Sequence, residues 1–161
     1  MIHQLYTRIS DLPETWDQVS ESCIFLQRNY LGVLENSAPA NMQNTFVGVF
    51  EGEKLIATAL FQEIDLAQLN SFGERDHFIL TQARNFLFRQ FASKLLIVGN
   101  NLLSGQNAYA CLPDVDKKKV VEKLKEVCHI WPNKSHLTIF KDFTLDQTKP
   151  FQIPAFSSDY P

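Results

Sequence analysis

The strongest pattern along the chain is a pair of β-rich runs separated by a short turn. Residues 45–50 (TFVGVF) and 55–64 (LIATALFQEI) are rich in β-branched, aromatic and small apolar residues, and Gly52 lies in the turn between them. Two such runs joined by a short glycine-containing loop predict an antiparallel hairpin. Because apolar residues occupy both faces of the second run, we expect that strand to lie inside a sheet.

Two short helices are predicted before this hairpin. The first begins at Asp11, which forms a capping box with Glu14. Its apolar stripe consists of Leu12, Trp16 and Val19. The second covers residues 22–36, with its stripe at Leu26, Tyr30, Val33 and Leu34. Spacings of three and four residues place each set on one face of a helix.

Two further helices are predicted after the hairpin. The first covers residues 75–91, with apolar positions at Phe78, Ile79, Ala83, Phe86, Leu87 and Phe91. The second is capped by Asp114 or Asp116. Its buried face consists of Val120, Val121, Leu124, Val127 and Cys128. Both patterns are typical of helices that cover a sheet.

Short strands complete the predicted fold. They are expected over residues 2–9, 94–98 and 137–140, and a loop is expected over residues 100–113. The order β-α-α-β-β-α-β-α-β predicts a mixed α/β fold, with helices on the faces of a mixed sheet. We expect one domain over residues 1–147 and a proline-containing tail or linker over residues 148–161.

Composition narrows the functional classes. The chain has 161 residues, of which 45% are apolar, and a formal net charge of −3. The net charge gives no general attraction to DNA, and no apolar run is long enough to span a membrane. The first residues lack the pattern of a signal peptide, and the three cysteines form no C-x-x-C pair, so we expect a cytoplasmic protein. The four histidines have no ligand spacing, and no metal site is predicted.

Three segments resemble a known family. They are residues 25–39 running into 46–49, the pair Gly99-Asn100 followed by Ser104-Gly105, and residues 139–143 (IFKDF). Together with the order of two helices, long hairpin, strand, loop, helix and strand, they resemble the N-terminal half of FemAB-like proteins of the GNAT acyltransferase fold. The resemblance covers about residues 20–160. It implies a largely antiparallel GNAT-like sheet that lacks the last strands of the full fold.

The resemblance also implies an activity. The family moves an acyl or aminoacyl group onto an amine, with acetyl-CoA, another acyl-CoA or aminoacyl-tRNA as the donor substrate and no required cofactor. The glycine-rich loop that cradles the donor's pyrophosphate in GNAT enzymes is replaced here by a stretch with two glycines six residues apart. The alternative is therefore a non-catalytic half, which acts as a scaffold or acceptor-binding module for a second GNAT-like half or for a homodimer partner.

The loop after Val98 is the candidate binding site. If the strand leaves the sheet at Gly99, backbone N–H groups are freed to bind a carbonyl oxygen or a phosphate. The candidate residues are Gly99, Asn100, Asn101, Ser104, Gly105, Gln106 and Tyr109. A solvated turn is the competing interpretation. No catalytic residue is assigned.

Two charged segments flank this loop in the sequence. Lys141 and Asp142 match the strand end of the family, and we interpret them as a local charge pair at a strand end rather than as a catalytic pair. The run of three lysines over residues 117–119 is interpreted as a solvated face, because successive residues point in different directions around a helix.

Overall fold

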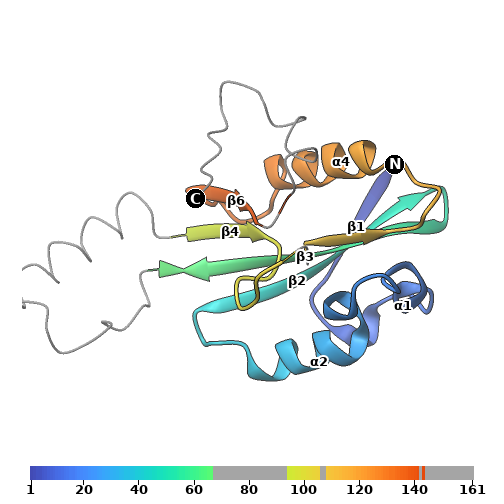
Figure 1. Ribbon diagram of the computed structural model, residues 1–161. Coiled ribbons are helices and arrows are strands. Elements are labelled where there is room, and N and C mark those ends of the chain that lie inside the picture. The colour runs from blue at the N-terminus through green and yellow to red at the C-terminus, as the bar shows by residue number, and fades with distance from the viewer. Residues whose placement is uncertain (67–93, 106–107, 142, 144–161) are drawn as a thin grey trace, which may run out of the picture.

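The computed structural model describes residues 1–66, 94–105, 108–141 and 143. These residues form a six-stranded sheet with helices on both faces (Figure 1). The strands are β1 (Ile2–Tyr6), β2 (Met42–Glu51), β3 (Lys54–Asp65), β4 (Lys94–Val98), β5 (Tyr109–Cys111) and β6 (Leu137–Phe140). The helices are α1 (Trp16–Val19), α2 (Arg28–Ser37) and α4 (Lys117–His129), with 3₁₀ turns η1 (Ile9–Asp11) and η2 (Ile24–Leu26).

The sheet is mostly antiparallel and has the order β1-β2-β3-β4-β6, with β5 also paired to β3. The predicted hairpin is confirmed as β2 and β3, with Phe46 opposite Leu60 and a register shift between Val49 and Phe50. Strand β3 lies inside the sheet, as its two apolar faces indicated. Strands β4 and β6 form a parallel pair, in which Ile97 lies opposite Ile139.

One edge of β3 is shared by two collinear strands. Residues 61–65 of β3 pair with β4, and residues 57–59 pair with β5, in both cases antiparallel. Between them, Leu60 accepts a hydrogen bond from Gly99 N at 2.9 Å and donates one to the Ala108 carbonyl at 3.1 Å. The chain therefore leaves this edge after Gly99 and returns to it at Ala108. The prediction of a continuous loop over residues 100–113 was wrong here, because a three-residue strand is too short to show a period of two.

Each face of the sheet has its own core. On one face, Trp16, Leu26 and Leu31 from the α1–α2 region pack against Phe46 and Leu60. On the other face, α4 packs against the sheet (Figure 1). Its contacts include Val120, Leu124 and Val127 from the helix and Val47, Phe61 and Leu96 from the sheet. Because alternate residues of a strand point to opposite faces, the hairpin supplies both cores.

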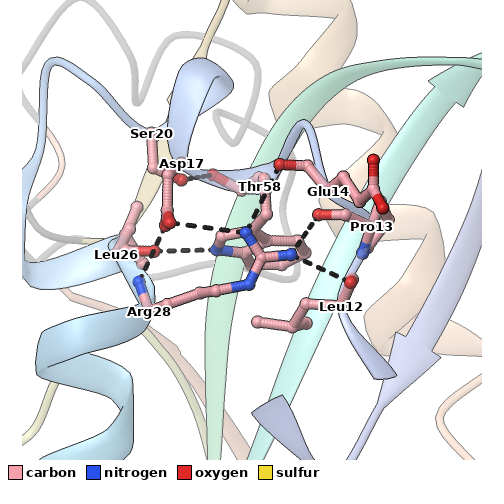
Figure 2. Close-up of polar contacts among 9 residues, drawn as sticks. Leu12, Pro13, Glu14, Asp17, Ser20, Leu26, Arg28 and Thr58 are labelled. Atoms are coloured by element: carbon pink, nitrogen blue, oxygen red, sulfur yellow. Dashed lines mark hydrogen bonds and ion pairs between the residues drawn. The ribbon is translucent and has the colours of Figure 1, made fainter. Parts of the chain in front are cut away.

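The first helix does not begin at Asp11. Asp11 ends the 3₁₀ turn η1, and α1 begins only at Trp16. The cause is Arg28, whose guanidinium donates to the carbonyl oxygens of Leu12, Pro13 and Glu14 (Figure 2). Those are the oxygens that a helix starting at Asp11 needs for its own hydrogen bonds. Asp17 completes the contact, with its carboxylate 3.3 Å from the guanidinium.

The second helix was predicted six residues too early. Gln27 is extended and separates the turn η2 from α2, so the apolar stripe counted from Leu26 does not continue into the helix. As a result Val33, predicted to be buried, is 59% exposed, and Leu31 takes the core position. Leu34 is buried as expected.

The later elements agree more closely with the bounds predicted from the sequence. Strands β4 and β6 have the predicted bounds, and β1 ends at Tyr6. In α4, Val120, Val121, Leu124 and Val127 are buried, while Cys128 is partly buried. The helix predicted over residues 75–91 and the tail over 148–161 lie outside the described residues. Within the described part of the chain, no helix has the length and apolar character needed to cross a bilayer.

Candidate functional site

The loop that follows β4 holds most of the residues predicted from the sequence. Gly99 and Asn100 are buried at its start, whereas Asn101, Ser104 and Gly105 are exposed. Tyr109 lies at the other end, in β5. The remaining predicted residues, Gln106 and Asp142, are outside the described part of the chain.

The amide N–H groups of this loop bond to the protein itself. Gly99 N donates to Leu60 O at 2.9 Å. Asn101 N donates to Gln62 Oε1 at 2.6 Å, and Leu102 N donates to Asn100 Oδ1 at 2.9 Å. Leu103 N lies 3.4 Å from Asn100 O. The expectation that amides after Val98 are free for an oxyanion or a phosphate was therefore wrong for these four residues.

A buried chain of side-chain amides fixes the start of the loop. Gln62 is fully buried, and its Nε2 donates to Asn44 Oδ1 at 2.8 Å while its Oε1 accepts from Asn101 N. Asn44 in turn donates to the Leu34 carbonyl at 3.3 Å. These hydrogen bonds connect α2, β2, β3 and the loop through uncharged groups, each of which is the donor or acceptor of another.

Asn100 is a second anchor for the loop. Its side chain is almost fully buried; Nδ2 donates to the hydroxyl of Tyr30 at 3.1 Å and Oδ1 accepts from Leu102 N. Sequence reasoning missed Asn44, Gln62 and Tyr30. A signal for two of them was present, since Asn44 and Gln62 are polar residues at the ends of runs that are otherwise apolar.

Aromatic packing occupies the region beside β5. The Tyr109 ring stacks on Phe143 with centroids 5.6 Å apart, and Phe143 meets Phe140 edge-on at 5.4 Å. The Lys141 ammonium donates to the Leu103 carbonyl, so it ties the end of β6 to the loop. Gly99, at φ +129°, makes this approach possible, because a Cβ there would lie 3.3 Å from the Lys141 Cβ.

The turn into α4 leads to an exposed helix N-terminus. Asp116 caps the helix, and its side chain accepts from Lys118 N at 2.9 Å. The turn contains Pro113, which has no N–H, and the carboxylate of Asp114. The three lysines at 117–119 are exposed, in agreement with a solvated face. A carboxylate already occupies the position that a phosphate would need.

The thiols and the ionisable groups give no reactive cluster among the described residues. Burial raises the pKa of the Cys23 and Cys111 thiols, and raises that of Cys128 to about 12. A thiol with a raised pKa carries little thiolate and is a poor nucleophile. Within the described ranges, no three His, Cys, Asp or Glu side chains come together as a metal site.

Comparison of the chain with protein-family models, with curated proteins and with solved structures finds no match.

Proposed function

We propose that the chain is a non-catalytic GNAT-like module that packs against a second domain or subunit. The observation that carries this proposal is the internal bonding of the loop after β4. Its amides at Gly99, Asn101, Leu102 and Leu103 all donate to acceptors of the protein. A ligand that needed those donors would have to break hydrogen bonds that are partly buried, at a net cost of about 1 kcal/mol for each.

The charge around α4 supports the same conclusion. Binding the pyrophosphate of an acyl-CoA needs free N–H groups and an absence of negative charge at the helix N-terminus. Here Asp116 bonds to Lys118 N, and Asp114 adds a second carboxylate close by in the turn. Both carboxylates repel a phosphate.

Exposed apolar residues on β6 support a packing role. Leu137 is 56% exposed and Ile139 is 37% exposed, and the two alternate along the strand, so they point to the same face. In the described sheet β6 is the outermost strand beside β4. An outer strand with an apolar face is a favourable surface for a partner, and in the purified protein that partner is a second copy of the chain.

The alternative function is an N-acyltransferase with an acyl-CoA or aminoacyl-tRNA donor. The element order supports it, because two helices and a long hairpin are followed by β4, α4 and β6, and the resemblance implies a strand, a helix and a strand in these places. The two functions differ in whether the chain binds the donor.

Thermal unfolding with acetyl-CoA and with CoA tests the proposal. We expect no change in Tm at millimolar ligand, with sodium pyrophosphate as a control for the effect of charge alone. A donor whose Kd is about a thousandfold below its concentration would stabilise the native state by about 4 kcal/mol and raise Tm by roughly 10 °C. A saturable rise with acetyl-CoA and CoA, and none with pyrophosphate, would establish the acyltransferase instead.

A further inference from the structure

Strand β6 has an outer edge with backbone groups that point away from the sheet. In the described sheet β6 pairs with β4 and lies at the end of the strand order (Figure 1). His136 N, directly before the strand, donates to the Lys94 carbonyl at 2.8 Å and so faces β4. Because alternate residues of a strand direct their N–H and C=O groups to opposite edges, Thr138 also faces β4. The backbone groups of Leu137 and Ile139 therefore lie on the outer edge.

The same two residues carry exposed apolar side chains. Leu137 lies opposite Leu95 of β4, and Ile139 lies opposite Ile97, so each continues an apolar row of the sheet to its outer strand. Ile97 is buried, whereas Leu137 and Ile139 keep much of their surface exposed. An outer strand that offers both backbone hydrogen-bonding groups and apolar side chains is a template for pairing with another strand.

The sequence of β6 is complementary to itself in one antiparallel register. A two-fold axis perpendicular to the sheet keeps every residue on its own face, so only odd-numbered residues lie opposite odd-numbered ones. A pairing centred on Thr138 places Leu137 opposite Ile139 of the second copy, and Ile139 opposite its Leu137. A centre at Leu137 would instead place Ile139 opposite Ser135. A centre at Ile139 would place Leu137 opposite Lys141, which lies beyond the end of β6. The register centred on Thr138 is therefore the one that joins both apolar residues.

We propose that β6 pairs antiparallel with β6 of a second copy of the chain, centred on Thr138, so that the two sheets become one continuous sheet. The N–H and C=O groups of Leu137 then bond to those of Ile139 in the second copy, and the two side chains pack against each other. Thr138 meets Thr138 of the second copy as a pair without mutual backbone hydrogen bonds. This inference rests on the packing function proposed above and specifies its partner and register. Because β6 has only four residues, the interface is small and the dimer is expected to be weak.

Disulfide crosslinking at Thr138 tests the register. In an antiparallel pair without mutual hydrogen bonds the opposed Cα atoms are about 4.5 Å apart, a distance that a disulfide can span. With oxidised glutathione, we expect Thr138→Cys to form a covalent dimer about tenfold faster than the unmodified protein, because the thiols are held together. The three native cysteines of the unmodified protein set the background.

Ser135→Cys is the matched control. Ser135 and Thr138 contact each other through their hydroxyls at 3.5 Å, so both variants lose the same contact. In the proposed register the two copies of residue 135 lie about 20 Å apart along the strands, too far for a disulfide. Ser135→Cys is therefore expected to crosslink at the background rate. Equal urea midpoints of the two variants confirm that both are folded.

A second variant separates a built interface from chance collisions of thiols. Adding Leu137→Ser and Ile139→Ser to Thr138→Cys is expected to return the crosslinking rate to the background, because the apolar contacts of the pair are lost. An unchanged rate in this variant, or equal rates in Ser135→Cys and Thr138→Cys, overturns the inference.

Light scattering of the unmodified protein distinguishes failure of the register from failure of the packing function. Self-association without crosslinking at residue 138 above the background overturns the proposed pairing of β6 and leaves the packing function in place. A monomer at every concentration, together with a rise in Tm on binding acetyl-CoA, overturns both.

Discussion

At the scale of single residues, Gln62 is the amide on which the loop after β4 depends. It has no exposed surface, donates to Asn44 Oδ1 and accepts from Asn101 N. A glutamine suits this position because it offers one donor and one acceptor without charge. Its hydrogen-bond partners, Asn44 and Asn101, are also neutral, so no cation is present to compensate the charge of a carboxylate at this position.

Gln62→Glu is therefore expected to destabilise the protein by about 3 kcal/mol at pH 7, measured by urea unfolding. The donor to Asn44 is lost and a charge is buried. Burial raises the pKa of the new carboxyl in the folded state above its unfolded value of about 4.3, so the loss of stability grows as the pH rises above that value and is smallest near pH 4.

Gln4→Glu is the matched control, because Gln4 is exposed on β1. It is expected to change stability by less than about 0.5 kcal/mol at either pH. Equal effects of the two substitutions would show that Gln62 is not the anchor described here.

At the scale of elements, local signals succeeded where no distant group competed with them. The sequence offered Asp114 and Asp116 as caps for α4, and the structure selects Asp116, whose carboxylate accepts from Lys118 N. The equivalent signal at Asp11 failed, because Arg28 from α2 takes the carbonyl oxygens that the helix needed (Figure 2). Arg28 is separated from Leu12 by 16 residues, so a local pattern carries no trace of the contact.

The two aspartates before α4 give a matched pair of substitutions. Asp116→Ala is expected to lower the free energy of unfolding by about 1 kcal/mol, because the cap of a 13-residue helix is lost. Asp114→Ala, at an exposed position two residues earlier, is expected to change it by less than about 0.5 kcal/mol. Chemical denaturation measures both. A larger effect at Asp114 than at Asp116 would show that Asp114 is the cap.

At the scale of the whole molecule, β6 leaves Leu137 and Ile139 exposed on one face of the outer strand. We expect the purified protein to self-associate, with a mass from light scattering that falls on dilution. Replacing both residues by serine removes apolar contacts worth about 3 kcal/mol and is expected to weaken association roughly a hundredfold. Ile24→Ser, at a residue that is 64% exposed on η2, is the control and is expected to leave association unchanged. A parent protein whose mass stays that of a monomer at every concentration contradicts this prediction.

Short-range patterns determined where several elements lie along the chain. The β2–β3 hairpin, the strands β4 and β6 and the buried face of α4 follow from residue type and spacing, because the turn, the alternation and the helical period are all local properties. The class of fold follows as well, since an alternation of helices and strands leaves few ways to bury their apolar faces.

The tertiary structure alone decided where the hydrogen bonds of the loop go. Gly99 and Asn101 each have an N–H donor in any conformation, but their acceptors on Leu60 and Gln62 become available only once β3 lies beside the loop. The same is true of the carbonyl oxygens that Arg28 binds. A sequence states which groups can donate and accept, whereas pairing over long separations depends on packing that brings those groups within 3 Å.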